Sequence, residues 1–381
     1  MWPEAVLLLE PRRWLIELDA FGPQNALVEY PWPAAALADL PLRLGIPTAM
    51  HYYASVALFM LAVDALFAWL LWRAAGRRAS RGLWLWLLVF PALGPVAVTR
   101  FDMVPAVLAG AALLALASAR PATAGVLASL GAGYKLWPAV GFAALLVPGT
   151  GAARARVLAG IGASLAGLAL ATVMAAGWTR LWSPLALQVE RGLQLEAFGA
   201  LPLLWARYLD GGARWAVRYQ DICNCQELFG PGVALALALS LPALLIAAAL
   251  VVALHVRAFA APAVARSAAL AALITVLSLL AWLLTARVFS PQYMLWLAAP
   301  LAVLGVLPGA TLERLDIALF IGATALTHLV YPLGYEAVLV ERHPLQLGFL
   351  LVITLRDALI VALGARLAMQ AWRLTRRPQP A

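Results

Sequence analysis

The sequence predicts an all-α protein that crosses a membrane many times. Of its 381 residues, 64% are apolar and only 12% are charged, and runs of about twenty apolar residues recur along the chain. Residues 179–231 form the one long polar interruption. The net charge of +9 reflects arginines at the ends of apolar runs, as in cytoplasmic loops of membrane proteins, so we expect no nucleic-acid partner.

The placement of arginines predicts how the chain is oriented across the membrane, and it divides the chain into three segments. The first convincing span, His51–Arg73, leads into an arginine-rich turn, which marks the cytoplasmic side. The N-terminus is therefore expected outside. We predict an external or interfacial segment at 1–49, a single transmembrane domain at 50–370, and a basic cytoplasmic tail at 371–381.

Several of the following passes are short. From residue 83 the chain is expected to rise to Arg100, descend to Arg120, rise again to Lys135 and return near residue 150. A helix of about fifteen residues spans about 22 Å, less than the hydrocarbon core of about 30 Å. Such helices must end in a protein-lined cavity, because irregular backbone at membrane depth is tolerated only there.

The later spans bring the total to about eleven transmembrane or partial-membrane helices, with the C-terminus cytoplasmic. No internal repeat suggests a transporter with two matching halves. The later spans are expected near 157–178, 233–256, 267–286, 293–307, 317–331 and 349–369.

Charge inside the apolar region marks the candidate site. The stretches "VTRFDMVP" and "GAGYKLWPA" place Arg100, Asp102 and Lys135 between apolar runs. Ionisable groups at membrane depth are costly unless they pair or line a wet cavity. Two structural alternatives remain open: Arg100 and Asp102 form a plain pair at a helix end, or Lys135 extends to the interface.

The predicted topology brings these residues and other polar groups to one outer face. Arginine and lysine suit a phosphate, and carboxylates suit a base that takes a proton from a hydroxyl. A lipid-linked phosphosugar needs both. The outer-face set is Glu4, Asp19, Glu29, Arg100, Asp102, Lys135, Glu190, Arg191, Glu196, Gln292 and Tyr293.

The histidines and cysteines of the sequence do not form a metal-binding motif. The four histidines show no ligand spacing, so we expect no metal site and no cofactor. Cys223 and Cys225 are too few for a metal site, and their one-residue separation is a poor geometry for bridging each other.

Six stretches in order resemble a known family. They are "EYPWP", "RFDMVPAVLAGAALLALA", "LGAGYKLWPA", "ERGLQLEA", "FSPQYMLW" and "THLVYPLGY". In this order they resemble glycosyltransferase family 87, the membrane mannosyltransferases of the GT-C superfamily that use polyprenyl-phosphate-mannose. The resemblance covers roughly residues 19–335.

The resemblance implies a GT-C-like fold in the plasma membrane, with an active site on the extracytoplasmic face, and the high Ala, Arg and Gly usage suggests a bacterial source. It also implies inverting, metal-independent transfer of a hexose, expected to be mannose, to a glycolipid or cell-envelope glycan. A carboxylate of the first outer loop would be the base. Relatives have an Asp after a first span, and counting back from Glu29 lands near Glu4, so Glu4, Asp19 and Glu29 all stay candidates. We expect the Asp to be displaced or missing because the chain is truncated at Met1.

The other roles follow from the same resemblance. Arg100, Lys135 and Arg191 are assigned to the donor phosphate, and Asp102 would hold Arg100 or touch sugar hydroxyls. Glu190 and Glu196 would orient Arg191, and Gln292 and Tyr293 would contact the sugar or acceptor. A transporter or lipid flippase, and a non-catalytic relative, remain the alternative functions.

Overall fold

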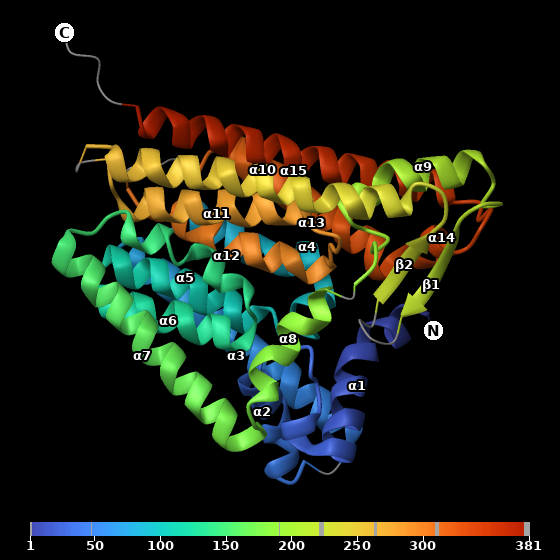
Figure 1. Cartoon of the computed structure of the whole chain (residues 1–381), viewed down its shortest axis with the longest axis horizontal. Coiled ribbons are helices and arrows are strands. Elements are labelled where there is room, and N and C mark those ends of the chain that lie inside the picture. Colours follow the sequence, from blue (N-terminus) through green and yellow to red (C-terminus); the bar gives the residue numbers. More distant parts are fainter. Residues whose placement is uncertain are drawn as a thin grey trace.

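A computed structural model describes residues 2–46, 48–189, 191–220, 225–262, 265–308 and 312–376, without the side chains of 2–7, 188 and 189. It is built almost entirely of helices, and most of them cluster side by side in two groups (Figure 1). The all-α prediction is confirmed, apart from one small hairpin.

Six helices of the described chain are long and apolar enough to cross a membrane, which confirms a multi-pass membrane protein. The first prediction, His51–Arg73, matches one of them within two residues at each end. The six are α3 (Ala49–Ala74), α7 (Gly151–Ala176), α10 (Val233–Ala260), α11 (Ala268–Thr285), α13 with the π-helical turn that follows it (Arg314–Leu333), and α15 (Gln346–Leu374).

Shorter apolar helices fill the centre of the molecule. All eleven residues of α12 (Met294–Leu304) are buried, and this helix packs against α4, α5 and α11. In contrast, α10 buries none of its most apolar window inside the protein. Since so large an apolar surface is unstable in water, α10 must face lipid. The other shorter helices are α4 (Arg81–Leu93), η1 (Gly94–Ala97), α5 (Met103–Ala117), α6 (Pro121–Tyr134), η2 (Trp137–Gly141), η3 (Ala144–Leu146) and η5 (Pro291–Tyr293).

The lengths of α5 and α6 decide where the buried charges lie. With 15 and 14 residues they are too short to cross the hydrocarbon core, as the sequence predicted. Asp102 precedes the first residue of α5, and Lys135 follows the last residue of α6 in an extended conformation. Because the two helices pack against each other, both side chains reach the same end of the pair.

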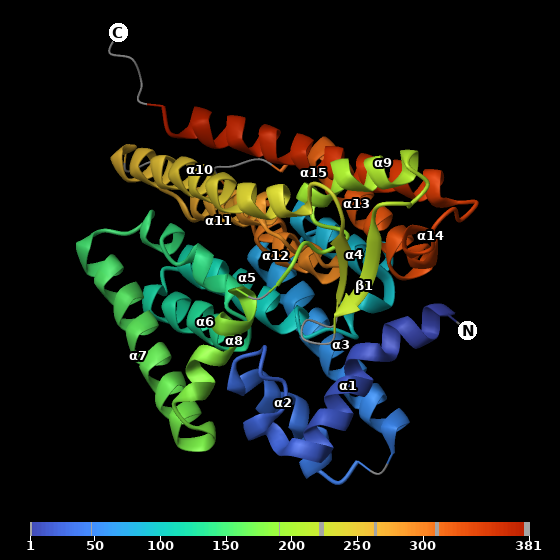
Figure 2. The same cartoon turned by 45° about the vertical axis from the view of Figure 1, so that its right-hand side comes forward.

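The N-terminal segment consists of two packed helices, α1 (Trp2–Asn25) and α2 (Trp32–Arg43), which lie beside α3 (Figure 2). Trp14 stacks on Phe101 at a centroid distance of 3.8 Å, which fixes α1 to the turn before α5. The buried Arg180 donates to the backbone oxygens of Ala26 and Leu27, and so ties the first turn of α8 to the end of α1.

The long polar segment contains structure that the sequence did not predict. Strands β1 (Ala216–Gln220) and β2 (Cys225–Phe229) form an antiparallel hairpin in which Arg218 is opposite Glu227. Arg207 of α9 donates to the backbone oxygens of Val338 and Leu339, which fastens α9 to α14. The segment also holds α8 (Thr179–Val189), η4 (Phe198–Ala200) and α9 (Leu201–Leu209), and after α13 come the π-helical turn η6 (Leu329–Leu333) and α14 (Tyr335–Leu339).

Cys225 is disulfide-bonded. The expectation of a poor bridging geometry also concerns Cys223, which lies outside the described residues.

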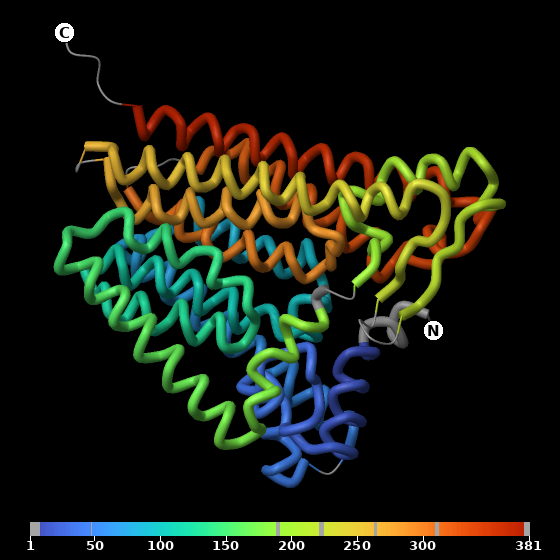
Figure 3. The backbone as a smooth tube through the Cα atoms, in the orientation of Figure 1, coloured from blue at the N-terminus to red at the C-terminus, as the bar shows by residue number. Residues whose placement is uncertain are grey.

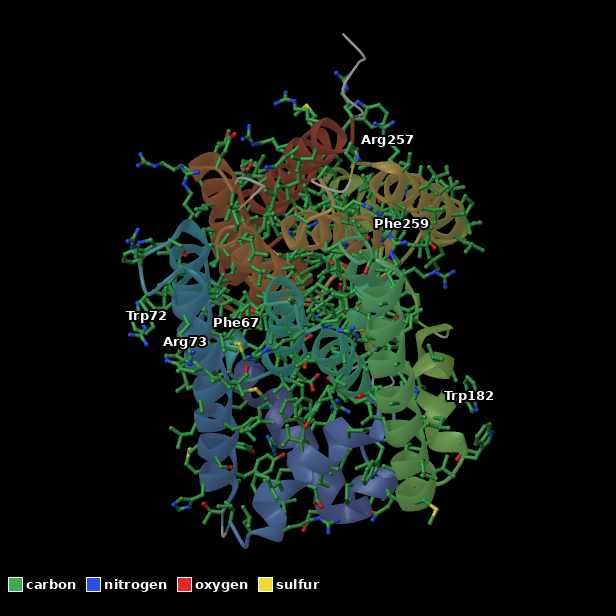
Figure 4. All side chains as sticks on the ribbon, turned by 90° about the vertical axis from the view of Figure 1, so that its left-hand side faces the viewer. Phe67, Trp72, Arg73, Trp182, Arg257 and Phe259 are labelled. Carbon is green, nitrogen blue, oxygen red and sulfur yellow. The ribbon has the colours of Figure 1, made fainter. Side chains whose placement is uncertain are left out.

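The two ends of the molecule differ in chemistry. The hairpin and α14 lie at one end, and α15 finishes at the opposite end (Figure 3). At that opposite end, which we call the basic end, Arg73 lies over the Trp69 ring and Arg257 over the Trp372 ring, with distances of 4.8 and 3.7 Å to the centroids. Arg73 lies at the periphery in Figure 4. Arginine and tryptophan together are typical of a membrane interface.

Close backbone packing of α6 against α7 supplies a test of the fold. A Cβ on Gly160 would lie 2.3 Å from the backbone oxygen of Ala122, whereas one on Gly162 would meet nothing within 4 Å. We therefore expect Gly160→Leu to destabilise the protein by about 2 kcal/mol through overpacking, and Gly162→Leu to leave stability unchanged. Thermal unfolding in detergent measures both, and equal melting temperatures for the two variants would contradict this packing.

Candidate functional site

A cavity of about 480 Å³ lies between α1, α12, the hairpin and the turns that precede α5 and follow α6. Its size is within the range of small-ligand sites. In the described part of the chain, its charged lining consists of four cations and three carboxylates: Arg13, Arg100, Lys135, Arg191, Glu10, Glu29 and Glu196.

Most of the side chains predicted from the sequence meet in this cavity. Asp102 lies behind the lining, with 1% of its surface exposed. Asp19 is exposed on α1 and is not one of the lining residues, so the structure gives it no place in the site. The side chain of Glu4 and the whole of Glu190 lie outside the described residues. The predicted residues that line the cavity are Glu29, Arg100, Lys135, Arg191, Glu196, Gln292 and Tyr293.

An ion pair joins the ends of α5 and α6 below the cavity. Lys135 Nζ lies 2.8 and 2.9 Å from the two carboxylate oxygens of Asp102, and Trp296 Nε1 donates to Asp102 Oδ1 at 2.5 Å. The expectation that Asp102 holds Arg100 is therefore wrong, because its oxygens are bound by Lys135 and Trp296. A buried carboxylate is stable only with such partners.

Four stacked rings, here called the aromatic wall, form one side of the cavity. Trp296 stacks on Tyr293 with a centroid separation of 3.7 Å, on Trp137 at 5.1 Å and on Trp282 at 5.4 Å. Lys135 Nζ lies 5.7 and 5.9 Å from the centroids of Trp296 and Tyr293. The wall therefore combines flat apolar faces with one fixed cation.

Arg13 of α1 binds three carboxylates, two from the same helix and one from the turn after it. It binds Glu17 at 2.7 Å, Glu10 at 3.2 Å and also Glu29. Burial opposes the charge of Arg13, but its interactions with Glu29 and Glu17 outweigh this and raise its pKa above the ordinary value. Sequence reasoning missed Glu10 and Arg13. Their spacing of three residues, with Glu17 four further on, places them on one helical face and is the signal that could have found them.

The Arg100 guanidinium is only partly satisfied. Its Nη2 donates to the Tyr331 hydroxyl at 2.8 Å, and its Nη1 lies 3.8 Å from Glu10 Oε1. Within the described part of the chain, Nε and Nη1 have no hydrogen-bond partner, although Arg100 is only 8% exposed. Buried donors left without acceptors are costly, which favours a ligand that supplies them.

A second buried ion cluster borders the cavity. Arg356 of α15, 0% exposed, donates to Glu196 Oε2 at 2.7 Å and to Asp357 Oδ1 at 2.8 Å. Two carboxylates therefore share one guanidinium. Burial raises the pKa of Glu196 to about 7; Arg356 opposes this shift and the charge of Asp357 adds to it.

The pairing of Glu196 also revises the expectation for Arg191. Glu196 was predicted to orient Arg191 but binds Arg356 instead. Arg191 lines the cavity and makes no hydrogen bond or ion pair with the residues that the structure describes. It is a cation in the cavity whose charge no described carboxylate neutralises.

Comparison with protein-family models, curated proteins and solved structures gave no match. Function must therefore be argued from the site itself. Over the residues that the structure describes, no group of three or more His, Cys, Asp or Glu side chains is placed to hold a metal ion.

The Lys135–Asp102 pair gives a stability prediction with a matched control. Asp102→Asn removes the countercharge of a half-buried ammonium, so we expect a loss of about 3 kcal/mol in stability. Asp210→Asn removes a similar charge from the exposed Arg214–Asp210 pair, which should cost less than about 1 kcal/mol. Thermal unfolding in detergent compares them, and a neutral Asp102→Asn variant would contradict the role given to this pair.

Proposed function

We propose that the chain is a membrane glycosyltransferase that transfers a hexose, with mannose the first candidate, from a polyprenyl-phosphate donor to a glycolipid or cell-envelope glycan. The observation that carries the proposal is one cavity with partnerless guanidinium nitrogens on Arg100 and Arg191, an aromatic wall and several carboxylates. Such a reaction needs a site for the donor phosphate, a site for the sugar and a base for the acceptor hydroxyl, and this combination supports all three.

The cations suit the donor phosphate. Arginine binds phosphate oxygens through its planar fork of N–H groups, and both Arg100 and Arg191 have nitrogens that lack acceptors in the described chain. During transfer the phosphate leaves and gains negative charge. Fixed cations stabilise that charge, so the reaction needs no general acid. Lys135 is held by Asp102 and contributes its remaining N–H and its positive field.

The aromatic wall suits the sugar. A hexose presents C–H groups on its faces and hydroxyls at its edge, and ligand sites commonly combine apolar walls with a few placed polar groups. Trp296 and Tyr293 offer ring faces, while Gln292 offers an amide beside them. The lining supplies three carboxylates for the acceptor hydroxyl: Glu10, Glu29 and Glu196. The family resemblance leaves Glu4, Asp19 and Glu29 open as the base, and of these Glu29 has a described side chain that lines the cavity.

The membrane arrangement follows from charge. The arginine-rich turn at 73–81 and the end of α15, which carries Arg373, lie at the basic end, opposite the hairpin, and this supports a cytoplasmic basic end in the plasma membrane. Disulfides persist in oxidising compartments, so Cys225 supports an extracytoplasmic hairpin and cavity. We keep about eleven crossings, with the N-terminus outside and the C-terminus inside, as part of this proposal.

Membranes containing the protein should move label from radiolabelled polyprenyl-phosphate-mannose to a new lipid or glycan. We expect Arg191→Ala to lower this transfer by about 10²-fold, since an unpaired cation for the phosphate is lost. Arg218→Ala, which removes an exposed arginine of the hairpin, should leave it unchanged. Label that stays on the original carrier in wild-type membranes, or crosses the membrane with it, would indicate transport and contradict the proposal.

A further inference from the structure

Glu196 has an environment that none of the other carboxylates in the cavity shares. It is 1% exposed and lines the cavity, and within the described chain its Oε1 has no hydrogen-bond partner. Its Oε2 and its backbone oxygen both accept from Arg356, at 2.7 and 3.0 Å. The side chain is therefore fixed through one oxygen, and the other oxygen is left with free lone pairs.

The other two carboxylates of the cavity, Glu10 of α1 and Glu29 of the turn after α1, are placed differently. Glu29 is bound by Arg13, and Glu10 accepts from both Arg13 and Trp14 while its other oxygen lies near Arg100. Glu29 is held by an arginine through one oxygen, as Glu196 is, but the Glu29 side chain is 12% exposed whereas that of Glu196 is 1% exposed. Burial favours the protonated form of a carboxylate, so Glu196 is the better placed of the two to take up a proton.

We propose that Glu196 is the general base that takes the proton from the acceptor hydroxyl, an inference that rests on the glycosyl transfer proposed above. In this step the hydroxyl proton moves to Glu196 Oε1, and the acceptor oxygen forms a bond to the anomeric carbon of the donor sugar. The bond from that carbon to the phosphate oxygen breaks, and its electron pair stays on the departing polyprenyl phosphate. Arg100 and Arg191 then face the added negative charge.

The groups around Glu196 set its proton affinity. Arg356 binds it from α15 and shares its guanidinium with Asp357. Tyr335 of α14 interacts with it electrostatically, and Tyr331 packs edge-on against Tyr335. Arg100 hydrogen-bonds to Tyr331. One guanidinium shared by two carboxylates leaves a net negative charge in a buried place, which favours one bound proton. The pKa of about 7 that follows from this burial suits a base that works near neutral pH.

Asp357 is then a positioning residue that tunes Glu196. Because the charge of Asp357 raises the pKa of Glu196, its removal should lower that pKa. A general base must be unprotonated, so activity falls as the pH drops through its pKa. In Asp357→Asn the acid limb of the pH profile should therefore move to lower pH, by about one unit.

The test measures transfer from radiolabelled polyprenyl-phosphate-mannose over a range of pH in membranes that contain equal amounts of folded protein. We expect Glu196→Gln to lower kcat by about 10²-fold or more with little change in KM, and to abolish the acid limb near pH 7 in the residual activity. Gln can still accept from Arg356, so thermal unfolding should be close to that of the wild type. Asp316→Asn is the matched control, since Asp316 of α13 pairs with Arg366 of α15, and neither residue lines the cavity. It should leave the acid limb in place.

The outcomes separate the two proposals. Wild-type membranes that move no label overturn the transferase itself. Active wild-type membranes with an unchanged pH profile in both Glu196→Gln and Asp357→Asn overturn only the role of Glu196. If Glu196→Gln is inactive because it fails to fold, Asp357→Asn still decides: a shifted acid limb supports Glu196, and an unshifted one contradicts it.

Discussion

The structure depends on the burial of charge at the ends of helices that are too short to cross a membrane. Lys135 and Asp102 meet at the ends of α6 and α5, where each compensates the other at a depth that neither could occupy alone. Trp296 donates to the same carboxylate, so the pair also fixes the aromatic wall. One ion pair thereby sets the floor and one side of the cavity.

The rest of the site is assembled from segments far apart in the chain. The turn before α5 brings Arg100 to Tyr331, and the long polar segment brings Glu196 to Arg356, 160 residues away. Each contact places a charged group that the apolar core would otherwise exclude. The carboxylates of the cavity are therefore all paired with cations. Some guanidinium nitrogens in the same cavity have no partner in the described chain, and these suit a negatively charged ligand better than a neutral one.

Sequence reasoning predicted the membrane class and the clustering of charge because both depend on periodic apolar runs and on helix length. It could not predict the partners of Asp102 or Glu196, since side-chain pairing is decided by tertiary packing between α5, α6, α12 and α15. The hairpin was missed because its strands lie in a polar segment without a long alternating pattern. Glu10 and Arg13 were missed because residues 1–49 were predicted only as an external or interfacial segment, without a helix, although their three-residue spacing indicated a shared helical face.

The central claim is that Arg100 and Arg191 hold the phosphate of a polyprenyl lipid in this cavity. A structure of the protein in lipid nanodiscs with added polyprenyl phosphate tests it most directly. We expect phosphate density about 3 Å from guanidinium nitrogens of both residues. The space for the donor sugar should then lie beside Trp296 and Tyr293. Density for the phosphate only at the basic end, with none in the cavity, would contradict it.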